Sequence, residues 1–423
     1  MKILVYGINF APEPTGIGKY SGDMAAWLAA AGHEVRVIAA PPYYPAWSIA
    51  QGYSAWRHVK EHWHGVGVWR APLWVPKRPT GATRVVHLLS FALLSIPILV
   101  RHLFWRPDVV LVVAPAFACA PAAWLAARLC GAKAWLHVQD FEVDAAFRLG
   151  LLNGRKRQRI VTAIEHWILR RFDRVSTISS RMLERLHLKG VQPSRVVAFP
   201  NWVDVNAIAP LPGPSAYRAE LGIAPDAVVA MYSGSMAGKQ GLDLLPEAAR
   251  ELARVIPNLI FVLCGDGVVK RNIEVQCADL HNVRLLPLQP VERLGELLNM
   301  ADVHLLPQHP DVADLVMPSK LTGMLASGRP VLAIADPGTE LARVVAPRGK
   351  VVPSDDLPAF VFALMELANN VSLRKRLGAS ARQYAEQHLA RDTILSNFEN
   401  ALRDCVVPVR DPNVSTAAIE PQQ

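Results

Sequence analysis

Two glycine-rich loops, each directly after an apolar run, contain residues that could hold phosphate groups. Gly16 and Gly18 follow the run 2–6, and Gly234, Ser235 and Lys239 follow the run 227–232. An apolar run without alternation is typical of a buried parallel strand, and open α/β sheets bind phosphorylated ligands at the carboxyl ends of such strands. Neither loop matches a complete dinucleotide-binding or P-loop motif. Facing each other across a cleft, the loops could hold one diphosphate from both sides.

Two lysines could supply the positive charge that a diphosphate needs. Ser319 and Lys320 follow Pro318 at the start of a predicted helix, 319–326, so a hydroxyl, helix amides and an ammonium could converge on one phosphate or ribose. This position favours a functional role for Lys320. For Lys239, a binding role and a solvated surface position are equally compatible with the sequence.

A polar cluster ends the predicted strand 134–138. His137 and Gln139 lie on one face by alternation, and Asp140 follows on the loop. A single histidine at a strand end is more often a hydrogen-bonded core residue than a catalyst, but Glu142 and Asp144 crowd the same position and favour a site. These residues match neither a Ser/His/Asp triad order nor the spacing of a metal-ligand motif, so we expect no metal ion in this site.

The alternation of strands and helices predicts an α/β protein with two tandem Rossmann-like domains. Expected strands of the first half are 2–6, 34–39, 67–70, 108–113, 134–138, 174–178 and 196–199, with helices at 18–31, 84–105, 119–130 and 157–172. The proline-rich stretch 200–214 interrupts the pattern, which then restarts. We therefore expect a first domain at 1–200, a second at 215–390, a helix at 391–406 that crosses back to the first domain, and a disordered tail at 407–423.

Charge and cysteine content limit the partners and the compartment. The net charge of +9 is concentrated in a basic stretch, 148–189, which indicates an anionic partner: a phosphate substrate, membrane headgroups or nucleic acid. Nucleic acid ranks last, because no aromatic-interleaved RNA signature or helix-turn-helix accompanies the charge. Five cysteines without paired spacing and the lack of an export leader predict a cytoplasmic protein.

An apolar segment, 84–106, raises the question of membrane contact. Its apolar run, 85–100, is shorter than the roughly 20 residues of a spanning helix, contains His87 and Pro97, and is flanked by Arg84 and Arg101. A buried helix and a helix lying in the bilayer interface are both compatible with it, and a transmembrane span is the least favoured. The surrounding tryptophans slightly favour the interface: Trp56, Trp63, Trp69, Trp74 and Trp105.

A set of motifs occurs in order along the chain: Gly16-Ile-Gly18, His137-Val-Gln-Asp140, Ser176-Thr-Ile-Ser179, Pro200-Asn201-Trp-Val-Asp204, Tyr232-Ser-Gly234, Gly265-Asp266-Gly267 and Ala326-Ser-Gly328-Arg-Pro330. This set resembles family 4 glycosyltransferases of the GT-B fold over nearly the whole chain. The segments 1–9, 32–38 and 40–45, together with Pro318-Ser-Lys320, are similar to colanic-acid biosynthesis glycosyltransferases.

The resemblance implies a retaining transfer of a sugar, with GDP-fucose as the expected donor, to a lipid-linked oligosaccharide at the inner face of the membrane, without metal or cofactor. It implies a donor on the second domain, an acceptor on the first, and a catalytic region at His137, Gln139 and Asp140. The residues that it implies for the donor are Gly16, Gly18, Asn201, Gly234, Ser235, Lys239, Gly265, Asp266, Ser319, Lys320 and Glu340.

The chain departs from the family pattern at four charged positions. Ser235 and Gln240 stand where relatives often have Arg and Lys, and Leu315 and Gly323 stand where relatives have paired glutamates. Lys239 is a candidate substitute for the lysine, and Asp311, Asp314 and Glu340 are candidate substitutes for the glutamates. The family histidine corresponds to His137 or, when aligned on Asp140, to Gln139. A nucleotide-sugar epimerase of the same architecture and a weakened enzyme acting as an assembly scaffold are the alternatives.

Overall fold

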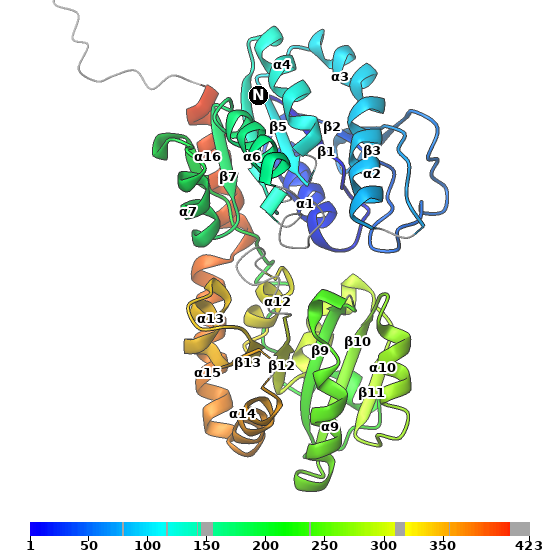
Figure 1. Ribbon diagram of the computed structural model, residues 1–423. Coiled ribbons are helices and arrows are strands. Elements are labelled where there is room, and N and C mark those ends of the chain that lie inside the picture. The colour runs from blue at the N-terminus through cyan, green and yellow to red at the C-terminus, as the bar shows by residue number, and fades with distance from the viewer. Residues whose placement is uncertain are drawn as a thin grey trace, which may run out of the picture.

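The computed structural model describes residues 1–77, 80–115, 117–141, 143–144, 155–236, 238–308, 318–354 and 356–406. Two α/β domains lie one above the other, each built around its own sheet (Figure 1). Both sheets consist largely of continuous apolar strands, because helices cover both faces of each sheet and leave few strand positions in contact with water.

The first sheet has eight strands in the order β3-β4-β2-β1-β5-β6-β7-β8. Their bounds are Lys2–Gly7 (β1), Glu34–Ala39 (β2), Val59–Trp63 (β3), Val66–Arg70 (β4), Val109–Ala114 (β5), Lys133–Val138 (β6), Arg174–Thr177 (β7) and Val196–Ala198 (β8). The helices are Gly16–Ala30 (α1), Gly81–Leu94 (α2), Ile96–Leu103 (α3), Ala120–Cys130 (α4), Arg155–Leu169 (α6) and Ser180–Leu188 (α7).

Strand β3 was not predicted, because it is a largely exposed edge strand with polar residues. It pairs antiparallel with β4 through a two-residue turn, in which His64 has φ +43° and Gly65 has φ +82°. Two successive positive φ angles are typical of a tight hairpin turn. All other neighbouring strands of this sheet are parallel, as predicted.

The prediction of one helix over 84–105 was wrong, because the segment forms two helices, α2 and α3, that meet at Ser95. Pro97 lies in the first turn of α3, where its missing N–H needs no partner. The Ser95 hydroxyl donates to the carbonyl of Phe91 and is 2.5 Å from the hydroxyl of Tyr6. The break is therefore anchored to β1 inside the first domain.

The second sheet has six parallel strands in the order β11-β10-β9-β12-β13-β14. Their bounds are Val228–Ser235 (β9), Leu259–Asp266 (β10), Val283–Leu286 (β11), Val303–Leu306 (β12), Val331–Ile334 (β13) and Gly349–Val352 (β14). The helices are Ala216–Glu220 (α8), Leu244–Val255 (α9), Lys270–Gln276 (α10), Leu294–Met300 (α11), Lys320–Ala326 (α12), Glu340–Val345 (α13), Leu357–Asn369 (α14) and Val371–His388 (α15).

The strand order reverses next to β1 in the first sheet and next to β9 in the second. Ligands of open α/β sheets bind in the crevice at such a switch point. Both glycine-rich loops follow these two strands, so the topology places each loop at the ligand-binding end of its domain.

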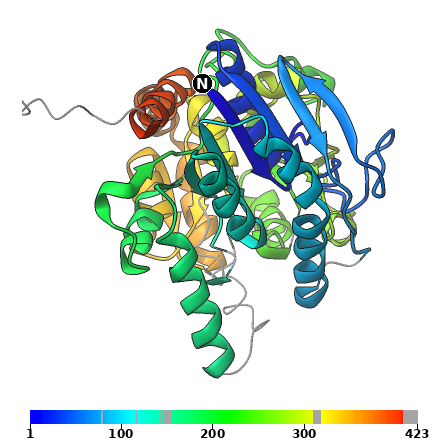
Figure 2. The same ribbon diagram turned by 90° about the horizontal axis from the view of Figure 1, so that it is seen from above.

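The last helix, α16 (Arg391–Val406), crosses back to the first domain as predicted (Figures 1 and 2). Phe398 stacks on Phe199 with ring centroids 3.8 Å apart and also packs edge-on against Trp135. Leu395 and Leu402 are fully buried in the same core as β1 and β5. The two domains are thus joined by the linker around 200–214 and by the passage from α15 to α16, and the tail 407–423 lies outside the described residues.

Candidate active site between the two domains

The loop of the first domain is built around a buried carboxylate. Helix α1 begins at Gly16, slightly earlier than predicted, and Gly16 has φ +63°, which favours glycine. Gly18 faces Glu13: a Cβ at position 18 would lie 2.3 Å from Glu13 Oε2. The second glycine of the loop therefore makes room for a side chain of the protein itself, and contact of either glycine with a donor stays a prediction.

Glu13 ties this loop to the neighbouring segment. Its Oε1 accepts hydrogen bonds from the backbone N–H of Tyr43 and Tyr44, at 3.2 and 3.1 Å, and its Oε2 accepts one from Asn9 Nδ2 at 3.0 Å. Burial raises the pKa of Glu13, while these hydrogen bonds and the nearby charge of Arg70 oppose the rise. Glu13 was missed in the sequence, although an acid between two prolines in a glycine loop is a usable signal.

His137 is a hydrogen-bonded core residue. It is 2% exposed, its Nδ1 is 2.9 Å from Ser176 Oγ, and its Nε2 is 2.9 Å from Gln139 Nε2. Burial lowers the pKa of His137 to about 3, so the ring is neutral at physiological pH. Since the Gln139 amide donates to Nε2, Nδ1 carries the proton and donates to Ser176. The two side chains lie on the same face, as the strand alternation predicted, the ring positions Gln139, and both ring nitrogens have hydrogen-bond partners.

Asp140 is half-buried and lies just beyond the end of β6. The pKa of Tyr44 is raised mainly by burial and further by the negative charge of Asp140. Asp144 does not join this group. Its carboxylate forms ion pairs with Arg185 and Lys189 of the α7 region, both at 3.0 Å. The predicted crowding of acids around Asp140 was therefore wrong for Asp144, and Glu142 lies outside the described residues.

In the second domain, β9 extends three residues beyond its predicted end, to Ser235. Gly234 has φ +133°, and a Cβ at Gly265 would lie 2.1 Å from the carbonyl oxygen of Gly234. The ends of β9 and β10 therefore approach each other more closely than any side chain would permit. Asp266 accepts the N–H of Gly267 at 2.8 Å, which orders the turn after β10.

Lys320 lies at this pair of strand ends. Its Nζ donates to the hydroxyl of Tyr232 at 2.8 Å and to Gln240 Oε1 at 2.9 Å, and it lies 4.2 Å from the centroid of the Tyr232 ring. A Cβ at Gly234 would be 3.5 Å from the same ammonium. The structure thus places a cation beside Gln240, where the family pattern has a lysine. The side chain of Lys239 and the positions Asp311, Asp314 and Leu315 are outside the described parts of the chain.

Glu340 connects the two domains. Its carboxylate accepts the backbone N–H groups of Ser180, at 2.8 Å, and Arg181, at 2.9 Å, in the first turn of α7. The Arg181 guanidinium donates to the carbonyl of Gly338 at 3.0 Å. A carboxylate at a helix N-terminus satisfies amides that have no partner within the helix. In this conformation the carboxylate of Glu340 serves the domain contact, and its predicted donor contact stays a prediction.

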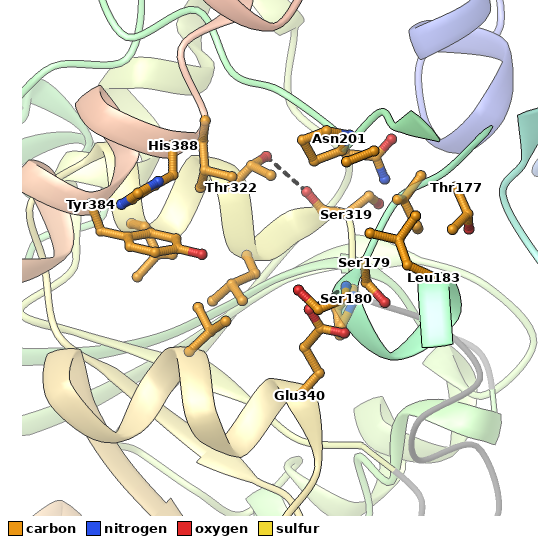
Figure 3. A pocket seen from close by; sticks show the side chains of 18 residues that line it. Thr177, Ser179, Ser180, Leu183, Asn201, Ser319, Thr322, Glu340, Tyr384 and His388 are labelled. Carbon is orange, nitrogen blue, oxygen red and sulfur yellow. Dashed lines mark hydrogen bonds between the residues drawn. The ribbon is translucent and has the colours of Figure 1, made fainter. Parts of the chain in front are cut away.

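A pocket of about 230 Å³ lies between the domains beside this contact (Figure 3). Three predicted donor residues, Asn201, Ser319 and Glu340, line it together with Tyr384 and His388 of α15. Next to it, the hydroxyl of Tyr20 in α1 is 3.5 Å from the carbonyl oxygen of Ser319, so the start of α12 touches the first domain. Gln139 and Lys320 do not line this pocket, so the predicted site residues fall into two groups.

Within the described residues, no group of three or more His, Cys, Asp or Glu side chains is arranged to hold a metal ion. The site offers instead one ammonium, several backbone amides at strand ends, and hydroxyl and amide side chains. An ammonium and backbone amides are groups that bind phosphates.

Family models match both domains. A glycosyl transferase 4-like domain matches residues 15–202, and the glycosyl transferases group 1 family matches residues 215–384. The chain therefore belongs to the group 1 (GT4) glycosyltransferases, a retaining family, and it has the GT-B fold. This membership favours the transferase over the predicted epimerase alternative.

The putative colanic acid biosynthesis glycosyl transferase WcaI of Escherichia coli strain K12 is 42% identical over 410 residues, which cover 95% of this chain and 100% of that protein. The chain is thus a homologue of a protein named for colanic acid biosynthesis. A D-inositol 3-phosphate glycosyltransferase of Kineococcus radiotolerans is 30% identical over 234 residues, which cover 50% of this chain and 52% of that protein.

Solved structures share the fold at low sequence identity. Sucrose-phosphate synthase from Thermosynechococcus elongatus has a TM-score of 0.72 at 17% identity, covering 95% of this chain and 98% of that chain. WaaG, a glycosyltransferase involved in lipopolysaccharide biosynthesis, has a TM-score of 0.67 at 18% identity, covering 96% and 100%. Anabaena HepE, solved in complex with UDP and glucose, has a TM-score of 0.67 at 16% identity, covering 96% and 100%.

Proposed function

We propose that the protein transfers a sugar from a nucleotide diphosphate to a lipid-linked oligosaccharide in the synthesis of an exopolysaccharide like colanic acid. GDP-fucose is the expected donor, and the cytoplasmic face of the inner membrane is the expected place. The observation that carries the proposal is the Lys320 ammonium, held beside Gly234 at the carboxyl end of β9. The relationship to WcaI supports the pathway.

The proposed chemistry uses the charge of Lys320 during bond cleavage. As the bond between sugar and diphosphate breaks, negative charge develops on the leaving diphosphate, and an ammonium held in place by Tyr232 and Gln240 stabilises it. The first domain, in contact with α12 through Tyr20, would cover the donor and exclude water, which favours transfer over hydrolysis.

Helices α2 and α3 support attachment to a membrane. Among the described residues, Gly81–Leu103 is long and apolar enough to cross a membrane by length and composition, and 28% of its most apolar window is buried. Figure 2 shows these helices on the outside of the first domain. Large apolar side chains are exposed along them: Val85, Val86, Leu89, Leu93, Leu94, Ile96, Val100 and Phe104.

The opposite face of the same helices is part of the core. His87 and His102 are 1% exposed. His87 Nδ1 lies 2.7 Å from the backbone carbonyl oxygen of Trp74, and the His102 ring packs edge-on against Trp69 of β4 with ring centroids 4.6 Å apart. A crossing of the bilayer would remove these contacts, whereas a helix lying in the interface keeps them. We therefore propose a peripheral attachment through the exposed face.

The donor is tested by incubating the purified protein with a panel of labelled nucleotide sugars and membrane extracts that contain lipid-linked oligosaccharides. We expect incorporation of label into the lipid fraction, with fucose from GDP-fucose preferred. Incorporation of label from a different nucleotide sugar would show that GDP-fucose is not the preferred donor. No incorporation from any member of the panel would contradict the proposed transfer.

The membrane attachment is tested by sedimentation with anionic liposomes. We expect the protein to pellet with them, and Leu93→Glu, at a side chain 65% exposed on α2, to reduce pelleting strongly. Phe362→Glu, at a side chain 70% exposed on the second domain, is the matched control and should have no effect. Equal behaviour of the two variants would argue against attachment through α2 and α3.

A further inference from the structure

An arginine and two aromatic residues lie where the exposed apolar helix α2 begins. Arg84 is exposed in the first turn of α2, and its guanidinium lies 5.5 Å from the centroid of the Trp47 ring. Tyr44 stands against the start of α1, with its Cε1 3.7 Å from where a Cβ of Gly16 would be. We call Tyr44, Trp47 and Arg84 the head site.

The head site is rigidly attached to the glycine loop of the first domain. The backbone N–H of Tyr44 is bonded to the buried carboxylate of Glu13, which also fills the space opposite Gly18. Tyr44 therefore cannot move without disturbing the loop. A ligand that contacts the Tyr44 ring would lie next to the start of α1 and the glycine loop of the first domain.

Trp47 is held in an unfavourable backbone conformation. Its φ is +53°, in the left-handed region that bulky side chains rarely adopt. Its ring is fixed in this position by Tyr43, at 5.7 Å between centroids, and by His87, at 5.5 Å. Backbone strain of this kind is concentrated at ligand sites, where the surrounding packing maintains it.

Arg84 carries a charge that no acidic side chain neutralises in an ion pair among the described residues. A guanidinium presents a planar fork of N–H donors that matches the oxygens of a phosphate. The positive charge of Arg84 also acts on the Tyr44 hydroxyl, where it opposes the rise in the Tyr44 pKa that burial causes.

The apolar stripe of α2 starts directly after Arg84. Val85, Leu89 and Leu93, spaced i, i+4 and i+8, form one exposed row along the helix. A molecule with a phosphorylated head at Arg84 could therefore lay its hydrocarbon tail along this row and remain in the bilayer interface. Neither a free nucleotide sugar nor a soluble phosphate would use both features.

We propose that the head site binds the phosphate or diphosphate that joins a polyprenyl-type lipid to the acceptor sugar, with the first sugars against Tyr44 and Trp47. This inference rests on the proposed function, since it assigns the part of the acceptor that the first domain recognises. It also separates two roles of the basic residues near the membrane: Arg84 recognises the lipid head, whereas Arg101 on α3 only attracts anionic surfaces.

The test compares Arg84→Gln with Arg101→Gln, which removes the same charge from an exposed position at the other end of the segment. Binding is measured to zwitterionic phosphatidylcholine vesicles that contain a polyprenyl diphosphate, and to vesicles with the same charge supplied by phosphatidylglycerol. We expect Arg84→Gln to weaken binding to the diphosphate vesicles roughly 10- to 100-fold, the size of one or two hydrogen bonds to a charged group. Arg101→Gln should affect both kinds of vesicle slightly and equally.

Equal loss of diphosphate binding in the two variants would overturn the proposal in favour of general charge attraction. A loss of nucleotide-sugar affinity in Arg84→Gln, measured by calorimetry without vesicles, would also overturn it, because the arginine would then belong to the donor site. If the vesicles discriminate as expected but no sugar is transferred from any donor, the head site stands and the proposed function fails.

Discussion

The two glycine-rich loops occupy equivalent positions at the switch points of their sheets, but their glycines serve different neighbours. In the first domain, Gly18 makes room for the carboxylate of Glu13, which is bonded to backbone amides. In the second domain, Gly234 is required by its φ of +133°, and the ammonium of Lys320 lies beside it, 3.5 Å from where a Cβ would be. One loop therefore encloses a negative charge that organises its own domain, and the other presents a positive charge.

This difference teaches that a glycine after a strand is not by itself evidence of a phosphate site. The charge of the side chain that approaches the glycine decides what the loop can bind, and that side chain comes from a distant part of the sequence. We expect the second loop to determine donor affinity and the first loop to determine the stability and shape of the acceptor side.

The largest expected effect is on donor binding through Lys320. Lys320→Gln should weaken the binding of the nucleotide sugar about 10- to 100-fold in calorimetry, because it removes a charged hydrogen-bond donor from the diphosphate. Adding Gln240→Lys should restore much of the affinity, since Nζ and Oε1 are 2.9 Å apart and the charge returns to nearly the same place.

Lys350→Gln is the matched control for that experiment, because Lys350 belongs to the same domain but pairs with Glu366 at 2.8 Å. It should leave donor affinity unchanged. Unchanged affinity in Lys320→Gln would remove Lys320 from the site. A double variant no better than the single one would mean that the position of the lysine, and not only its charge, is required.

An intermediate effect is expected from Gly18→Ala, on stability. The added Cβ would overlap Glu13, and the carboxylate cannot withdraw without leaving the amides of Tyr43 and Tyr44, so we expect a loss of about 1–3 kcal/mol in unfolding free energy. Denaturant unfolding measures it. Gly213→Ala, at a glycine with no atom within 4 Å of the added Cβ, is the control and should be nearly neutral. A stable Gly18→Ala variant with weakened donor binding would reverse our comparison of the loops.

The smallest effect at neutral pH is expected from two buried histidines, His137 in the first domain and His304 in the second. Burial lowers the pKa of His137 and of His304 to about 3, from 6.5 when unfolded. Between these two pKa values the histidine is protonated in the unfolded chain but not in the folded one. The unfolding free energy therefore keeps its full value above pH 6.5 and decreases as the pH falls towards 3.

His304→Asn and His137→Asn should each flatten this loss, as measured by unfolding free energy between neutral and acidic pH. Only His137→Asn should also lower the transfer rate, because His137 holds Gln139, a residue of the predicted catalytic region, whereas His304 bonds Ser327 inside the second domain. An unchanged pH slope in both variants would show that other groups cause the acid sensitivity.

Local patterns predicted the fold well where burial was continuous. The apolar runs that became β1, β5 and β9 were recognised, because strands buried on both faces need apolar residues at every position. The edge strand β3 was missed because neither of its faces is buried, so its sequence shows no alternation of apolar and polar residues. The break at Ser95 was also missed, since the apolar pattern continues through Pro97 although the helix does not.

Predicting the site residues was harder than predicting the fold. The sequence indicated Lys320 by its place after Pro318 and Ser319, and the structure adds the partners Tyr232 and Gln240 that hold it. Glu13, Tyr44 and Trp47 were not recognised, because their importance depends on packing around the loop rather than on any spacing in the sequence. Glu340 was recognised, but the structure shows it capping α7 in the first domain.

The sequence by itself determined the two tandem domains, the positions of the glycine loops at strand ends and the family to which the chain belongs. These features depend on residues that are neighbours in the chain, and their periodicity records local burial. Only the tertiary structure decided which charge each loop receives, because Lys320 reaches Gly234 and Glu340 reaches α7 through the packing of whole sheets and of α16. Contacts between residues so far apart in sequence arise from the packed domains, and no local pattern encodes them.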